Sequence, residues 1–299
     1  MCDTDTSAGV AAAAPADRAG TAPADGGFRV VVTGKGGVGK TSLTALLARL
    51  LARDGRRVLA LDADPQMNLP YAVGLPVDQA RALVPISQNR AYVEEKTGAS
   101  SDAGWGLYFR LNPDATDAVE RYAVAGPDGV QVMVMGTTVQ PAAGCLCPEN
   151  TLLAGVVEAM NLREREAILM DTQAGVEHFG RALAKGFHHA LVVCDPTFNA
   201  VQVAVHAAGL AADMGIPAVH LVANRVRDAG EAARLEARLA EAGGFPFTSM
   251  HVLPHDDTLL AAEPSVTPLL TDGDAPLLAA VTGVIAALAR SEEALSCAS

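Results

Sequence analysis

The chain has 299 residues, and its hydrophobic content of 50% is enough for one large buried core, so a second domain is not required. A formal net charge of −12 argues against a broad nucleic-acid interface, because phosphate backbones are bound by clustered Lys and Arg. No run of about 18 apolar residues occurs, and the N-terminus lacks a secretory signal. We therefore expect a cytoplasmic protein that neither binds nucleic acid nor inserts into a membrane.

Both ends of the chain are expected to be flexible. Residues 1–27 are rich in Ala, Asp, Gly, Pro and Thr and hold almost no bulky apolar side chains, so burial cannot offset the entropy of ordering them. Residues 293–299 are expected to form a flexible C-terminus, which leaves one domain at 28–292. In a cytoplasmic chain the five cysteines do not indicate a disulfide framework.

The first predicted strand, Phe28–Val32, leads into a phosphate-binding loop, GKGGVGKT. Its glycines let the backbone curl so that successive N–H groups can hold the oxygens of a polyphosphate. Leucines at helical spacing from Ser42 onward predict a helix whose positive N-terminal end lies beneath the phosphates. The residues that we expect to bind the nucleotide here are Gly34, Gly36, Gly37, Val38, Gly39, Lys40, Thr41 and Ser42.

Three side chains of this loop have specific predicted roles. Lys40 is expected to reach the β and γ phosphates, and the Thr41 hydroxyl is expected to bind Mg²⁺. Lys35 supplies a second cation that a single site does not need. It resembles the signature lysine of the MinD/ParA class of P-loop proteins, and this resemblance implies that Lys35 crosses a dimer interface to the partner's ATP. The alternative is a solvated loop lysine.

The second predicted strand, Arg57–Leu61, is followed by the acidic segment DADPQMNL. Carboxylates at the C-terminal end of a parallel strand arrive beside the bound nucleotide. We assign Asp64 to positioning the attacking water and Asp62 to the Mg²⁺ shell, and the segment resembles the first switch region of the MinD/ParA class. The alternative is that both acids cap a turn. The next span, Tyr71–Gly129, has poor periodicity, and we expect only an insertion of uncertain structure.

A CxC pair, Cys145 and Cys147, lies between a predicted strand at Gln131–Met135 and a predicted helix at Asn150–Met160. A soft-metal site takes about four ligands, so the natural completion is the same pair from a second subunit. We expect this pair to bind Ni²⁺ or Zn²⁺. Three alternatives remain open: inert packed thiols, a redox-active pair and a bridging iron–sulfur cluster.

Carboxylate and amide side chains follow two later strands. The strand Glu166–Met170 ends in DTQAG, which gives a Walker B-like carboxylate, Asp171, and a glycine typical of a γ-phosphate-sensing switch. Asn224 follows the strand Val219–Ala223 and matches the purine-contacting asparagine of the MinD/ParA class. We also expect Pro254, in the LPHDD stretch, to meet the base. Since no NKxD motif follows, ATP is favoured over GTP.

The order of these elements predicts the fold class. The further predicted elements are strands at Ala190–Val193 and Ser249–Val252 and helices at His178–Lys185, Asn199–Met214, Gly230–Ala242 and Leu277–Arg290. Strands that alternate with helices predict an α/β fold with a single doubly wound, mostly parallel sheet and helices on both faces. ATP hydrolysis needs positioning and charge neutralisation, for which Lys35, Lys40, Asp64 and Asp171 are sufficient with Mg²⁺.

Three segments in the same order resemble one family in particular. These are DADPQMNL, GCLCPE around the cysteine pair, and DTQAGVEHFGR. With the P-loop they resemble CooC, the accessory ATPases for nickel insertion into carbon monoxide dehydrogenase. The resemblance implies a nucleotide-gated homodimer that holds Ni²⁺ or Zn²⁺ between its subunits and has carbon monoxide dehydrogenase as its client. The competing hypotheses are a positioning switch of the MinD/ParA type, in which the CxC pair is merely structural, and an electron donor resembling the iron protein of nitrogenase.

Overall fold

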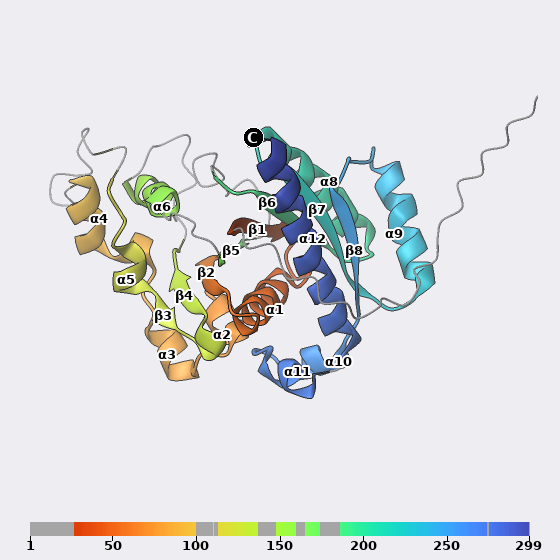
Figure 1. Ribbon diagram of the computed structural model, residues 1–299, viewed down its shortest axis with the longest axis horizontal. Helices are drawn as coiled ribbons and strands as arrows, with labels where there is room; N and C mark the ends of the chain where they lie inside the picture. The colour runs from red at the N-terminus through yellow and green to blue at the C-terminus, as the bar shows by residue number, and fades with distance from the viewer. Residues whose placement is uncertain are drawn as a thin grey trace, which may run out of the picture.

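The computed structural model describes residues 27–99, 110, 113–136, 148–159, 165–173, 186–273 and 275–298. Its centre is an eight-stranded sheet with the order β3-β4-β2-β5-β1-β6-β7-β8 (Figure 1). All neighbouring strands are parallel except β3 and β4. The strands are β1 (Phe28–Gly34), β2 (Arg57–Ala63), β3 (Val124–Ala125), β4 (Gln131–Val134), β5 (Glu166–Thr172), β6 (His189–Cys194), β7 (Ala218–Val226) and β8 (Ser249–Pro254). The predicted fold class is confirmed.

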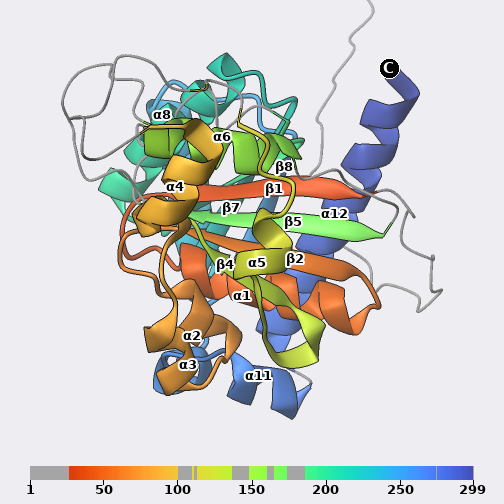
Figure 2. The same cartoon turned by 90° about the vertical axis from the view of Figure 1, so that its left-hand side faces the viewer.

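The helices come largely from the segments with apolar periodicity. The longer ones are α1 (Lys40–Arg53), α4 (Arg90–Thr97), α6 (Pro148–Ala159), α8 (Phe198–Asp213), α9 (Ala229–Glu241) and α12 (Pro276–Ala298). In Figure 2 the central strands run across the view, with α1 below them and α6 and α8 above, so the sheet is covered on both faces. The helix expected at His178–Lys185 and the tail expected at 1–27, apart from Gly27, lie outside the described residues.

The sheet forms because its central strands carry almost only apolar side chains, which are buried on both faces. The α1 stripe of leucines packs onto it, with Leu43, Leu46, Leu47 and Leu51 each at most 2% exposed. Since the strands are parallel, their C-terminal ends meet at one edge. This places the P-loop after β1 beside the carboxylates that end β2 and β5.

Much of the span Tyr71–Gly129, for which the sequence predicted no elements, is helical. It contains α2 (Leu69–Val73), α3 (Val77–Ala82), the 3₁₀ turn η1 (Ile86–Gln88), α4, α5 (Ala118–Tyr122), β3 and the 3₁₀ turn η3 (Pro127–Gly129). Most of these elements are too short to show a period.

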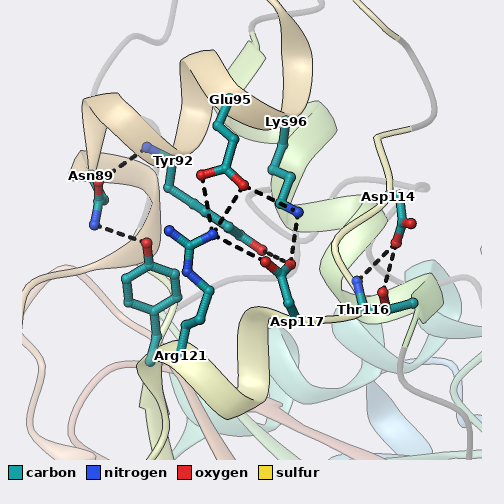
Figure 3. Close-up of polar contacts among 9 residues, drawn as sticks. Asn89, Tyr92, Glu95, Lys96, Asp114, Thr116, Asp117 and Arg121 are labelled. Carbon is teal, nitrogen blue, oxygen red and sulfur yellow. Dashed lines mark hydrogen bonds and ion pairs between the residues drawn. The ribbon is translucent and has the colours of Figure 1, made fainter.

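A polar cluster joins α4 to α5 (Figure 3). The buried Tyr92 hydroxyl donates to Asp117 Oδ1 (2.9 Å), and Lys96 and Arg121 both form ion pairs with the same carboxylate. Burial opposes ionisation of Asp117, but the hydrogen bonds from Lys96, Arg121 and Tyr92 outweigh it and lower the pKa of this carboxyl. The Arg121 guanidinium also lies 4.8 Å from the Tyr92 ring centroid. Contacts between positions far apart in the sequence therefore hold this region together.

The C-terminal helix is longer than its apolar pattern predicts. Helix α12 packs on β8 and α1 and continues past Arg290 to Ala298, through the stretch that we expected to follow the domain as a flexible end. Near its end, Glu292 bonds the rings of His188 and His189, which explains how the helix stays attached after its apolar face ends. No helix in the described ranges is long and apolar enough to cross a membrane.

Candidate active site

The phosphate-binding loop connects the end of β1 to the start of α1, as the sequence predicts. Its glycines are required by the geometry at two positions. Gly34 has φ 142°, and a Cβ there would lie 2.1 Å from the Val193 carbonyl oxygen of the neighbouring strand. Gly39 has φ 96°, and a Cβ there would lie 2.4 Å from Asn224 Nδ2. Only glycine fits both the positive φ and these contacts.

Three carbonyl groups of the loop accept hydrogen bonds from side chains. Lys40 Nζ donates to the Lys35 carbonyl (3.2 Å), and Asn224 Nδ2 donates to the Val38 carbonyl (2.8 Å). Arg225 Nη1 donates to the Gly37 carbonyl (2.8 Å). The last two donors come from β7, where the pairing with β8 is irregular between Ala223 and Val226. The loop is thus held from the sheet as well as by its own lysine.

Thr41 and Asp171 meet beneath the loop. Thr41 Oγ1 donates to Asp171 Oδ2 (2.6 Å), while Asp171 Oδ1 is buried and has no hydrogen-bond partner among the described residues. Burial raises the pKa of Asp171 to about 7, and repulsion from Asp64 adds to this, although Thr41 and Lys40 oppose it. A hydroxyl beside a buried carboxylate oxygen that lacks a partner is a donor set suited to Mg²⁺, a hard cation that prefers oxygen.

The magnesium assignment follows from this fit. Thr41 and Asp171 are the residues that would hold the ion, directly or through water. When bound, Mg²⁺ neutralises charge on the phosphate oxygens. The protein's own contribution is the fixed position of the two side chains at the ends of adjoining elements, α1 and β5.

Asp62 and Asp64 have different surroundings in the acidic segment after β2. Asp62 is fully buried, and its two oxygens accept from the backbone N–H groups of Asp64 and Leu69 (both 2.9 Å). Burial raises the pKa of Asp62 to about 8, and the nearby Asp171 carboxylate adds to the shift. Asp62 therefore folds the segment back on itself. The Asp64 side chain is half-buried, and within the described chain its carboxylate accepts only from the Gln66 backbone N–H (2.8 Å).

The two predicted lysines also differ. Burial lowers the pKa of Lys40, and Asp171 and Asp64 act in the opposite direction, which places its ammonium group near both carboxylates. Lys35 is half-buried, and its ammonium group makes no hydrogen bond or ion pair with any described residue. The predicted roles of Lys40, Asp64 and Asp171 require proximity, and the electrostatic coupling among these three groups is consistent with it.

A pocket lies beside the P-loop, where the ends of β7 and β8 meet α1. It brings together residues from three separate segments, including Gly39, Ser42, Asn224, Arg225, Pro254 and Leu259. Four of these were predicted to bind the nucleotide. Asn224 itself is 7% exposed, and its side chain bonds the loop and the Arg225 backbone N–H. Its predicted contact with a purine remains a prediction.

Arg225 is the site residue that the sequence reasoning missed. In the sequence it stands directly after Asn224, where its one evident effect is to break the guanine-specific NKxD motif. The signal that gives it a role is its backbone, with φ 60°, which a sequence does not display.

The cysteine pair lies outside the described residues, as do Gly175 and the EHFGR segment. Within the ranges that the structure describes, no group of three or more His, Cys, Asp or Glu side chains could hold a metal ion. The predicted Ni²⁺ or Zn²⁺ site at Cys145 and Cys147 therefore remains a prediction.

Known proteins resemble this chain in sequence and in fold. A profile of the CobQ/CobB/MinD/ParA nucleotide binding domain matches residues 29–268. The carbon monoxide dehydrogenase accessory protein CooC of Rhodospirillum rubrum is 35% identical over 236 residues, which cover 79% of this chain and 87% of that protein. An uncharacterized ATP-binding protein of Methanocaldococcus jannaschii is 30% identical over 250 residues, or 83% of this chain and 93% of the relative.

Among solved structures, the cell division protein MinD of Aquifex aeolicus superimposes with a TM-score of 0.59 at 22% identity. The match covers 89% of this chain and 97% of MinD, and at this identity it supports the fold alone. The sequence relatives go further, because they share the nucleotide-binding domain over most of both chains. The protein is an ATPase, and it belongs to the CooC family within the CobQ/CobB/MinD/ParA class of nucleotide-binding domains.

Proposed function

We propose that this ATPase is a metallochaperone that inserts nickel into carbon monoxide dehydrogenase. Cys145 and Cys147 of two subunits bind Ni²⁺ or Zn²⁺ between them, and ATP binding closes the homodimer while hydrolysis resets it. The reaction takes place in the cytoplasm. The observation that carries the proposal is the similarity to the Rhodospirillum rubrum accessory protein, together with the CxC pair of this chain.

The P-loop supports the dimeric part of the proposal. The Lys40 ammonium group lies near Asp171 and Asp64 of its own subunit, and the ammonium group of Lys35 has no partner within the described chain. Under the proposal Lys35 binds the ATP of the second subunit. Asp64 positions the attacking water, and Asp171 and Thr41 hold Mg²⁺. Asp62 belongs to the shell around that ion and also fixes the segment that carries Asp64.

The experiment is a nickel titration of the full chain in the presence of Mg²⁺ and ATP. We expect one metal ion per dimer, strongly reduced uptake by Cys145→Ala, and nickel-dependent activation of carbon monoxide dehydrogenase that requires ATP. Cys297→Ser is the matched control, because Cys297 is an exposed free cysteine elsewhere in the chain. Equal metal uptake by wild type and Cys145→Ala, or a chain that stays monomeric with ATP and nickel, would contradict the proposal.

A second candidate is a MinD-like switch in positioning or partitioning that has no metal role. The similarity to MinD of Bacillus subtilis, 28% identical over 201 residues, favours it. Such a protein would bind membranes or DNA in an ATP-dependent way. Pelleting with liposomes or with DNA, with and without ATP, separates the two candidates, since the metallochaperone should stay in the supernatant in both assays.

A further inference from the structure

Arg225 occupies an unusual backbone position at the end of β7. Its φ is 60°, a backbone conformation that residues other than glycine rarely adopt. The register between β7 and β8 shifts at this point, so the chain bulges. Such outliers persist where the surrounding structure requires them, often at functional sites. Here the bulge directs the Arg225 side chain to the P-loop, where Nη1 meets the Gly37 carbonyl at 2.8 Å.

The contact between Arg225 and the Gly37 carbonyl determines which way the neighbouring peptide N–H groups point. In a trans peptide the C=O of one residue and the N–H of the next point in opposite directions. Arg225 holds the Gly37 carbonyl toward β7, and Asn224 holds the Val38 carbonyl the same way. The N–H groups of Val38 and Gly39 must then face away from β7. Consecutive N–H groups aimed at one point form the nest that binds phosphate oxygens.

We propose that Arg225 is a positioning residue for ATP binding: it fixes the Gly37–Val38 peptide so that the loop offers its N–H groups to the phosphates. The guanidinium acts through the loop. It makes a charge-assisted bond to a backbone oxygen, which is stronger than a bond between neutral groups. Without it, the peptide can rotate and the loop loses part of its preorganisation for the anion.

The alternative role for Arg225 is a contact with the base, since the residue also lines the pocket beside Pro254. The two roles differ in which part of the nucleotide they affect. If Arg225 positions the loop, its replacement weakens the binding of any ligand with a polyphosphate, whether or not that ligand carries a base. If Arg225 contacts the base, its replacement weakens the binding of ATP and leaves the binding of inorganic tripolyphosphate unchanged.

The experiment compares the affinities of ATP and of inorganic tripolyphosphate, each with Mg²⁺, for wild type, Arg225→Met, Arg225→Lys and Arg227→Met. Arg227 is the matched control, because it lies two residues along and pairs with Glu231 at the protein surface. Loss of one hydrogen bond of this kind should weaken binding by about three- to tenfold. We expect Arg225→Met to weaken both ligands by the same factor, Arg225→Lys to lie between it and wild type, and Arg227→Met to match wild type.

In steady-state assays, Arg225→Met should raise KM for ATP and leave kcat within about twofold, because the loop binds the phosphates before and during the reaction. Unfolding curves for each variant separate this effect from a loss of fold. Weakened ATP binding with unchanged tripolyphosphate binding would assign Arg225 to the base instead. Unchanged affinity for both ligands in Arg225→Met would overturn the proposal.

Discussion

The buried carboxylate of Asp171 should destabilise the protein when neither nucleotide nor Mg²⁺ is bound. Its side chain is 1% exposed, and one of its oxygens has no partner among the described residues. Replacement by asparagine keeps the shape and one carbonyl-type oxygen for the Thr41 hydroxyl, but removes the charge. We therefore predict that Asp171→Asn is more stable than wild type at neutral pH and inactive as an ATPase.

The size of the effect follows from the pKa of Asp171, which burial raises from 3.8 to about 7. Each pKa unit corresponds to about 1.4 kcal/mol, so ionisation in the folded state costs on the order of 4 kcal/mol. In the variant the asparagine NH₂ group takes the place of Oδ1 and has no hydrogen-bond partner, which lowers the gain in stability by about 1 kcal/mol or more. The variant should gain about 2 to 3 kcal/mol above pH 7.

The sign of the pH dependence is fixed by linkage. Between pH 4 and pH 7 the unfolded wild-type chain has released the proton of Asp171 and the folded chain still holds it, so stability falls as pH rises through this window. Asparagine does not titrate. The difference between the variant and wild type should therefore grow from pH 4 to pH 7 and stay constant at higher pH.

The assay is urea unfolding in EDTA at several pH values from 5 to 8, repeated with Mg²⁺ and ATP. Binding stabilises wild type and should reverse the order of stability, because the variant has lost a magnesium ligand. Asp78→Asn on the exposed surface of α3 is the control and should show no such gap. The reasoning would be refuted if Asp171→Asn were less stable than wild type at pH 8 in EDTA. It would also be refuted if the difference in free energy of unfolding between the two proteins did not change with pH.

Three further predictions concern single side chains. Lys40→Ala should abolish ATP turnover and leave the unfolding curve cooperative, because Lys40 is the cation that the site places next to its carboxylates; undiminished turnover contradicts the assignment. Arg49→Met should lower the free energy of unfolding by about 2 kcal/mol in urea unfolding, since it leaves the buried Val73 carbonyl without its donor and removes one of the two guanidinium groups that pair with Asp128, the other being that of Arg53; the double variant with Asp128→Asn should lose less than the sum of the two single variants. Tyr92→Phe should cost about 1 kcal/mol by the same measurement through the lost bond to Asp117, with kcat for ATP unchanged, and a matching fall in kcat would show that the α4–α5 cluster acts on the site.

The sheet could be predicted because its signal is local. A parallel strand covered on both faces is a short apolar run, and seven such runs were found. The missed strand, β3, has only two residues and pairs antiparallel with β4. The helices α2, α3 and α5 have five or six residues each, less than two turns, so no period can appear in them.

The same distinction applies to the site. The P-loop is one contiguous motif, and its glycines, Lys40 and Thr41 could be placed from the sequence. The contacts that hold the loop come from Asn224 and Arg225, and they depend on a register shift between two strands late in the chain. Proximity of Asp62 to Asp171 likewise depends on the pairing of β2 with β5. Such contacts are tertiary, and spacing in the sequence does not report them.

The pairing of β2 with β5 also explains why the site depends on cations. It sets Asp62 and Asp171 opposite each other, and Asp64 follows two residues later, so three carboxyl groups share one small region; among the described residues, Lys40 is the cation that acts on Asp171 and Asp64. If Lys40 turns to the phosphates, as its predicted role requires, it leaves the carbonyl of Lys35 and its attraction to Asp171 is shared with the nucleotide. A divalent cation held by Thr41 and Asp171 would restore the balance of charge at that point. The raised pKa values of the buried acids and the requirement for Mg²⁺ with ATP therefore have one cause, which is the burial of more acidic than basic side chains at the end of the central strands.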